Sequence, residues 1–164
     1  MGMIGYFLRV TKPELDEYLK DSSLLEDLID SYDEGDEKLV DIDRSWEGII
    51  FLLTGQCLAD ADHPLKRILF SGQLIDDDQD LGYGPAHYLT PQQVADLNNE
   101  ISEIDTAELK QRFDSERMTA LGIYPEIWNE GDGAFEYLMG YFLITQQVYK
   151  LAAKNSNAII TFIS

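Results

Sequence analysis

The chain has 164 residues, with 31 Asp and Glu against 12 Lys and Arg, which gives a formal net charge of −19. A surface this negative repels phosphate, so the charge argues against nucleic-acid binding and against electrostatic attachment to anionic lipid. The chain is also 45% hydrophobic and 11% aromatic, which is too apolar for intrinsic disorder. We therefore expect one folded domain over residues 1–164.

The negative charge is concentrated toward the N-terminus. Residues 1–63 carry 16 acidic and 5 basic residues, a net charge of −11, whereas residues 114–164 carry 6 and 3, a net charge of −3. The densest run, residues 26–37, has seven acidic residues in twelve, and a second cluster lies at residues 76–80. Three interpretations stay open: a solubilising surface, adaptation to a high-salt cytoplasm, or a surface that docks a basic protein partner.

Hydrophobic spacing and capping residues predict the elements in chain order. We expect a buried strand at 3–10, helices at 12–20 and 23–32, and a short strand or helix lead-in at 38–42. A helix at 43–54 is followed by an expected strand at 65–70 and a short strand at 86–89. Helices are then expected at 90–104, 105–113, 114–121 and 132–154, and a strand at 158–163. Capping boxes are expected where Thr11, Ser23 and Thr90 precede Glu14, Glu26 and Gln93 by three residues. Gly55 suits the left-handed position just after a helix.

Apolar strands near both ends, with helices between them, predict an α+β fold. We expect a small mixed or antiparallel sheet that contains both terminal strands, paired near its centre, with the helices packed on one side. The helix at 132–154 carries a wide apolar stripe and is predicted to be a long C-terminal core helix. Its stripe consists of Phe135, Leu138, Met139, Phe142, Tyr149 and Ala152.

The sequence contains few groups for catalysis or metal binding. Its histidines are His63 and His87 and its single cysteine is Cys57, so an internal disulfide and a multi-thiolate metal site are excluded. A thiol nucleophile at Cys57 near His63 is less favoured than a structural cysteine. A metal site formed by Asp60, Asp62 and His63 is less favoured than a solvated loop. We expect no cofactor and no metal site.

Asp76, Asp78 and Asp80 alternate as at the start of an EF-hand loop. The sixth position is Leu81 instead of glycine and the twelfth is His87 instead of glutamate, so the calcium-loop pattern fails. No signal peptide or apolar span of about 20 residues is visible. A cytoplasmic location is the default expectation.

The segment from Gly82 to Tyr88, Gly-Tyr-Gly-Pro-Ala-His-Tyr, is the strongest candidate for a pocket. Two glycines around Tyr83 permit close approach of a ligand, and His87 could exchange protons near neutral pH. The alternative is a tight turn that leads into a strand. The remaining pocket candidates are large aromatic side chains and an arginine that could bind a carboxylate. They are Trp46, Tyr124, Trp128 and Arg112, with Arg117 as a second possible anion ligand.

Several motifs together resemble the YfbM-like family of bacterial proteins of unknown function. The resemblance is carried by residues 1–7 (Met-Gly-Met-Ile-Gly-Tyr-Phe), 41–46 continuing to 52–55, 80–91, 112–114, 123–125 and 127–128. It implies a small cytoplasmic α+β protein and brings no known activity or catalytic residue. Members of the family often carry histidine around the Trp46 helix, where this chain has Glu47 and Ile50.

These features favour a non-catalytic binding or protein-interaction module with an acidic face, of the kind expected of an immunity protein or an inhibitor. The alternative is a small enzyme with a pocket around Tyr83 and His87 that acts on a small anionic substrate. A third possibility is a charged structural protein whose oligomeric state, which the sequence does not reveal, is what matters.

Overall fold

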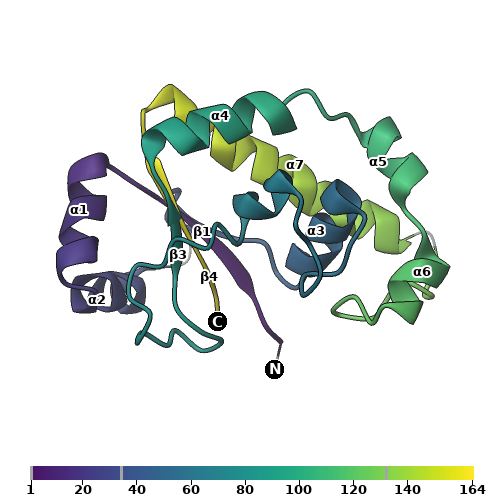
Figure 1. The fold of residues 1–164 in the computed structure, drawn as a ribbon, viewed down its shortest axis with the longest axis horizontal. Helices are drawn as coiled ribbons and strands as arrows, with labels where there is room; N and C mark the ends of the chain where they lie inside the picture. The colour runs from purple at the N-terminus through teal and green to yellow at the C-terminus, as the bar shows by residue number, and fades with distance from the viewer. Residues whose placement is uncertain (1, 34, 132) are drawn as a thin grey trace.

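The computed structural model describes residues 2–33, 35–131 and 133–164. Met1 of the first family motif, Glu34 of the acidic run and residue 132, the expected first residue of the last helix, lie outside these ranges. The elements are shown in Figure 1. They are β1 (Gly5–Val10), α1 (Lys12–Lys20), α2 (Ser23–Ser31), β2 (Leu39–Asp41), α3 (Trp46–Thr54), the 3-10 helix η1 (Pro64–Ile68), β3 (His87–Leu89), α4 (Pro91–Ile101), α5 (Thr106–Arg112), α6 (Ser115–Ala120), α7 (Gly133–Lys154) and β4 (Ala158–Ile163).

The sheet has the strand order β2-β1-β4-β3, and every neighbouring pair is antiparallel. β1 and β4 pair along their whole lengths, from Gly5 opposite Ile163 to Val10 opposite Ala158. The α+β fold, the sheet that includes both terminal strands and their central pairing are therefore confirmed. The long C-terminal helix is also confirmed as α7.

Helices cover both faces of the sheet, so the prediction of one-sided packing is wrong (Figure 1). Phe7 and Ile159 face a core shared with α3, α4 and α7, whereas Leu8 and Ile160 face a second cluster with α1 and α2. The physical reason is visible in β4, whose six residues are all buried. A strand covered on both faces is apolar in nearly every position and lacks the alternation of a half-exposed strand.

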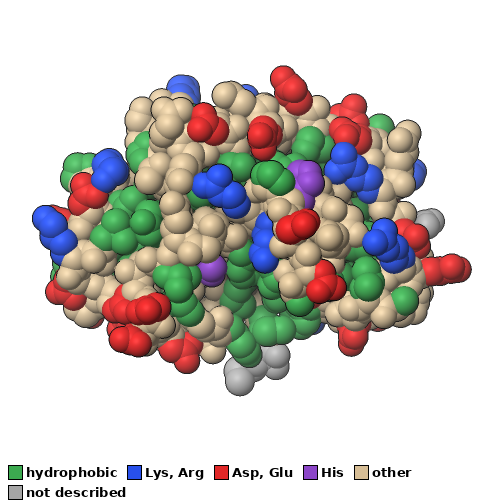
Figure 2. All heavy atoms as spheres, in the orientation of Figure 1, with side chains coloured by type: hydrophobic (Ala, Val, Ile, Leu, Met, Phe, Trp, Pro, Cys, Tyr) green, Lys and Arg blue, Asp and Glu red, His purple; other side chains and the backbone are tan. Residues whose placement is uncertain are grey.

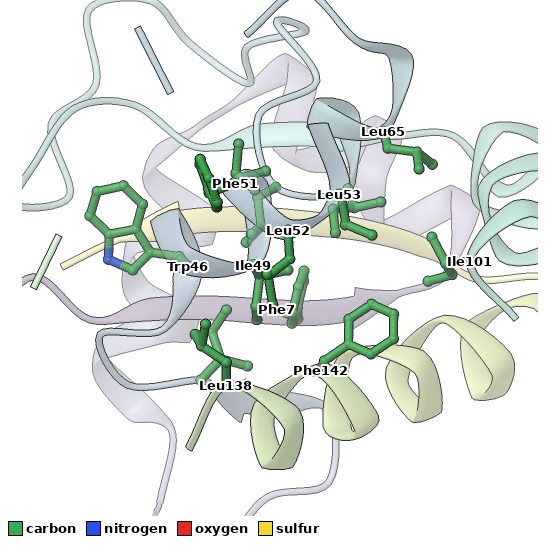
Figure 3. Close-up of a cluster of buried hydrophobic side chains, with 14 of the residues drawn as sticks. Phe7, Trp46, Ile49, Phe51, Leu52, Leu53, Leu65, Ile101, Leu138 and Phe142 are labelled. Atoms are coloured by element: carbon green, nitrogen blue, oxygen red, sulfur yellow. The ribbon is translucent and has the colours of Figure 1, made fainter. Parts of the chain in front are cut away.

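The larger core lies on the face of the sheet that α3, α4 and α7 cover. In Figure 3, Phe7 of β1, Ile49 of α3 and Phe142 of α7 lie close together in this layer. Gly48 permits the close approach of α3, because a Cβ there would lie 2.6 Å from Leu138 Cδ2 and 2.8 Å from Trp128 Cη2. Seven of the nine α3 residues are buried, so this helix is the centre of the packing.

Two of the three predicted capping boxes, those of Thr11 and Thr90, are present. Both bonds of the Thr11 and Thr90 boxes are present, and Gly55 has a φ of 75° after α3. The Ser23–Glu26 box is wrong. Asp21 Oδ1 accepts from the amide and hydroxyl of Ser23 instead.

The strand expected at 65–70 is also wrong, since η1 occupies most of this segment. Pro64 favours a first helical turn, and the Nδ1 atom of His63 accepts the amide of Leu65 at 3.1 Å. The helix expected to reach residue 104 ends earlier, at Ile101 in α4. None of the helices in the described ranges is long and apolar enough to cross a membrane.

Candidate functional site

The two acidic stretches of the sequence lie against each other in the fold. The hydroxyl of Ser22 donates to Asp76 Oδ2 at 2.7 Å, and Gln79 Nε2 donates to Glu26 Oε1 at 3.2 Å. The loop at 76–80 is thereby fixed to the N-terminal turn of α2. Figure 2 shows red side chains gathered over this part of the molecule, at its lower left. We use the name acidic face for Glu26, Asp30, Asp33, Asp41, Asp76, Asp77, Asp78 and Asp80.

The acidic face is not neutralised from within. The ion pairs found in the described ranges are Lys12–Asp16, Arg44–Asp43 and Arg112–Glu108, and they include no residue of this face. Hydrogen bonds from Ser22 and the Asp78 amide lower the pKa of Asp76. The amides of Gly82 and Gly84 lower the pKa of Asp80 in the same way. Both carboxylates therefore stay ionised further into acid than a free aspartate.

Asp76, Asp77 and Asp78 have carboxylate oxygens within 4.8 Å of one another. Both oxygens of Asp76 already accept hydrogen bonds, one from Ser22 and one from the Asp78 amide at 3.0 Å. These bonds are those of a local turn, and the cluster is accounted for by the loop's attachment to α2.

A row of aromatic rings joins segments that are distant in the sequence. Tyr124 stacks on Trp46 with centroids 5.3 Å apart, Trp46 meets the edge of Phe70 at 5.9 Å, and Phe70 meets His87 at 5.5 Å. The polar atoms of the first two rings hold the N-terminal segment. Trp46 Nε1 donates to the Met3 carbonyl, and the Met3 amide donates to the Tyr124 hydroxyl, both at 2.9 Å.

The expected pocket around Tyr83 and His87 is small. Both side chains line one cavity of about 50 Å³, together with Phe70 and Phe162. Such a volume holds one or two waters, whereas ligand pockets span roughly 300–1,000 Å³. His87 Nδ1 accepts the Gly72 amide at 3.1 Å. Burial, reinforced by the charge of Lys66, lowers the pKa of His87, so its imidazole is neutral at pH 7.

Arg112 lies in a different region, at the C-terminal end of α3. One of its guanidinium nitrogens donates to the Leu52 carbonyl at 3.1 Å, and the other donates to Glu108 at 2.7 Å. Arg117 donates to the Gly55 carbonyl at 3.0 Å. We call Arg112 and Arg117, with the carbonyls that they contact, the α3 cap. Two cations at a helix C-terminus satisfy free carbonyls and oppose the negative end of the helix dipole.

Trp128 lies beside the α3 cap and not beside Tyr83. It is 1% exposed, its indole nitrogen donates to the Ile123 carbonyl at 2.7 Å, and its ring meets Phe113 edge-on. The fold therefore brings together four of the candidate site residues, Trp46, Tyr83, His87 and Tyr124, and places Arg112 and Trp128 elsewhere. Phe70, which links Trp46 to His87, was not singled out because its apolar run resembled a strand.

The remaining candidates have local structural partners. Cys57 Sγ lies 3.3 Å from Asp60 Oδ2, while the Nδ1 atom of His63 is engaged by η1. Glu47 accepts the Tyr124 amide at 2.8 Å and the Leu58 amide at 3.3 Å, so it fastens two loops to α3. From the sequence, Glu47 was notable only because members of the family often carry histidine around this helix.

Comparison with known proteins decides the family. Residues 1–162 match the family described as Domain of unknown function (DUF1877). The chain belongs to this DUF1877 family. A curated relative, Protein YfbM of Escherichia coli strain K12, is 28% identical over 131 residues, which cover 77% of this chain and 75% of YfbM. The resemblance to YfbM-like proteins is thereby confirmed.

A solved structure has the same fold. The crystal structure of YfbM from E. coli, described as a protein of unknown function, superposes with a TM-score of 0.79 at 23% identity, covering 99% of this chain and 100% of YfbM. The superposition shows that the two proteins share a fold. Membership in the DUF1877 family thus identifies the architecture and leaves the biochemical role to be argued from this chain's own surface.

Proposed function

We propose that the protein is a non-catalytic binding module that docks a basic protein partner on the acidic face. The observation that carries this proposal is the attachment of the 76–80 loop to α2 through Ser22–Asp76 and Gln79–Glu26. This attachment joins two separate runs of carboxylates into one surface. A patch of one charge sign accelerates encounter with a partner of opposite charge and selects against partners of like charge.

The composition of the chain supports a protein partner. Its net charge of −19 disfavours nucleic acid and anionic lipid, while a basic protein has the complementary surface. The single cysteine fits a cytoplasmic setting, which we include in the proposal. The cavity of about 50 Å³ at Tyr83 and His87 is too small for a metabolite, so the binding function is favoured over catalysis there.

Affinity capture with matched charge variants tests the proposal. The Asp30→Lys/Asp33→Lys double variant reverses two exposed carboxylates of the acidic face. Its control, Glu100→Lys/Glu103→Lys, makes the same change in charge at exposed positions in and just after α4. We expect the wild type and the control to retain a basic protein from lysate of the native cell. The acidic-face variant should bind that protein about tenfold more weakly or worse.

The purified pair should then show an affinity that falls steeply with added salt, because exposed charges are screened. Equal retention by all three proteins, or a captured partner without a basic surface, would contradict the proposal. Turnover of a small metabolite by the wild type, lost in a His87→Gln variant, would favour the enzyme alternative instead.

A further inference from the structure

One groove combines aromatic side chains with carboxylates. It has a volume of about 440 Å³ and lies between the C-terminal end of α2, the chain that follows it, and the edge strand β2. Its aromatic lining comes from Tyr6, Tyr32 and Phe162, and its carboxylates come from Asp33 and Asp41. None of the described residues that line it is Lys or Arg. We call it the aromatic groove.

Strand register builds the floor of the aromatic groove. Tyr6 of β1 is the direct partner of Phe162 in β4 on one side and of Asp41 in β2 on the other. The Tyr6 and Phe162 rings stack with centroids 5.0 Å apart and planes 14° from parallel. Burial and the adjacent Asp41 charge both raise the pKa of Tyr6, which agrees with a carboxylate held close to this ring.

The carboxylate of Asp41 is held in place by the backbone. Its Oδ1 atom accepts the Asp43 amide at 2.5 Å. Arg9 does not line the groove, although its charge partly offsets the raised pKa of Tyr32. Its guanidinium nitrogens donate at 3.4 Å to the Glu37 carbonyl and to Asn157 Oδ1. The groove therefore offers aromatic surface and negative charge together without a cation of its own among the described lining residues.

A second groove continues the first. It has a volume of about 250 Å³ and shares Ile29 and Ser164 with the aromatic groove, and its carboxylates are Glu26, Asp30 and Asp80. Together the two grooves form a track with an aromatic end and an acidic continuation. A track of this kind suits a peptide segment with several positive charges better than it suits a single small cation.

We propose that the aromatic groove receives an arginine side chain of the basic partner, with neighbouring basic residues along the acidic continuation. The assignment rests on the proposed function and names its anchoring contact. A guanidinium is planar and weakly hydrated, so it can lie against aromatic rings and pair with a carboxylate at the same time. A lysine ammonium is compact and strongly hydrated, and it gains less from the same surroundings.

Two peptides that differ only in their cation test the assignment. The probes are fluorescently labelled Gly-Arg-Gly-Arg-Gly-Arg-Gly and Gly-Lys-Gly-Lys-Gly-Lys-Gly, titrated with the full chain at low salt and followed by fluorescence anisotropy. We expect the arginine peptide to bind about threefold to tenfold more tightly than the lysine peptide. Tyr32→Leu and Asp41→Asn should each weaken binding of the arginine peptide about fivefold.

Two control variants make the same chemical changes outside the aromatic groove. Tyr83→Leu removes a tyrosine that is 55% exposed, and Asp62→Asn removes a charge at an exposed position outside the acidic face. Each should change the affinity less than twofold by comparison. NMR of the wild type gives an independent measurement, in which the arginine peptide should shift the ring signals of Tyr6, Tyr32 and Phe162 more than those of Tyr137.

The outcomes separate the two proposals. If both peptides bind with equal, salt-dependent affinity and the groove variants behave like their controls, the arginine assignment is overturned and docking on the acidic face stands. If neither peptide binds and no basic partner is captured, both proposals fail. If the variants do not fold, ring shifts confined to residues outside the groove would overturn the assignment on the wild type alone.

Discussion

The α3 cap and the acidic face use charged side chains in opposite ways. At the α3 cap, Arg112 and Arg117 contact backbone carbonyls, and Glu108 is paired with Arg112. On the acidic face, Asp30 and Asp33 are exposed and take part in no ion pair among the described residues. The few cations that the α3 cap uses therefore serve the fold, while the excess carboxylates lie in water where a partner can reach them.

The largest expected effect tests the interior beside the α3 cap. Trp128→Ala removes a 1% exposed indole and its hydrogen bond to Ile123, so we expect the free energy of unfolding to fall by about 3–5 kcal/mol. Leu24→Ala, in the 43% exposed position on α2, should cost less than about 1 kcal/mol. Urea denaturation of both variants measures the difference. Equal losses of stability would contradict the difference between the buried interior at Trp128 and the exposed surface of α2 at Leu24.

A smaller effect is expected from the cap itself. Arg112→Met keeps much of the side-chain length and removes its bonds to Leu52 and Glu108, which should destabilise the protein by about 1–2 kcal/mol. The control Lys110→Met removes an exposed cation from the same helix and should stay within about 0.5 kcal/mol of the wild type. A loss for Lys110→Met as large as that for Arg112→Met would mean that general charge, and not the cap, is responsible.

Asp80 belongs to the acidic face yet is engaged by the backbone, so it provides an intermediate case. Its pKa is lowered from 3.8 by the amides of Gly82 and Gly84, so its ionised form stabilises the fold above that value. This contribution is lost as pH falls through the lowered pKa. Asp80→Ala should therefore be less stable than wild type at pH 6, and the gap should narrow toward pH 2. Thermal melts over this range measure the gap, and a constant gap would contradict the assignment.

The smallest effect is expected at Asp30 and Asp33, whose carboxylates are exposed to water. Asp30→Asn/Asp33→Asn removes two like charges without breaking a hydrogen bond of their side chains in the described structure, and should raise the free energy of unfolding by up to about 0.5 kcal/mol. The gain should shrink in about 0.5 M salt, where the Debye length is short. A clear loss of stability would show that these carboxylates serve the fold, as the α3 cap does.

Much of the fold could be predicted from local patterns. The six apolar residues of β4, the stripe of α7 and the boxes at Thr11 and Thr90 each indicate an element without reference to the rest of the chain. The failures have equally local causes. Pro64 turned an apolar run into η1, and Asp21 took the place of the expected box at Ser23.

The candidate site could be predicted only within one motif. Tyr83 and His87 are four residues apart, so their shared cavity follows from a single turn. The acidic face depends on Gln79 reaching Glu26 across 53 positions, and hydrophobic periodicity carries no signal for such a contact. Tyr6 of the aromatic groove lies in a predicted strand and in the first family-like motif, but its position opposite Phe162 and Asp41 follows from strand register, which the sequence pattern did not reveal.

The pairing of β1 with β4 has a consequence for synthesis on the ribosome. β1 is translated long before β4, yet Gly5 must pair with Ile163 in the middle of the sheet. Until residue 158 and those after it emerge, β1 has β2 on one side and an open edge on the other. Long-range pairing of this kind is slow and leaves an edge open to aggregation. A nascent chain stalled anywhere in α7 therefore holds an unfinished sheet, and its native core closes only after the last strand has been translated.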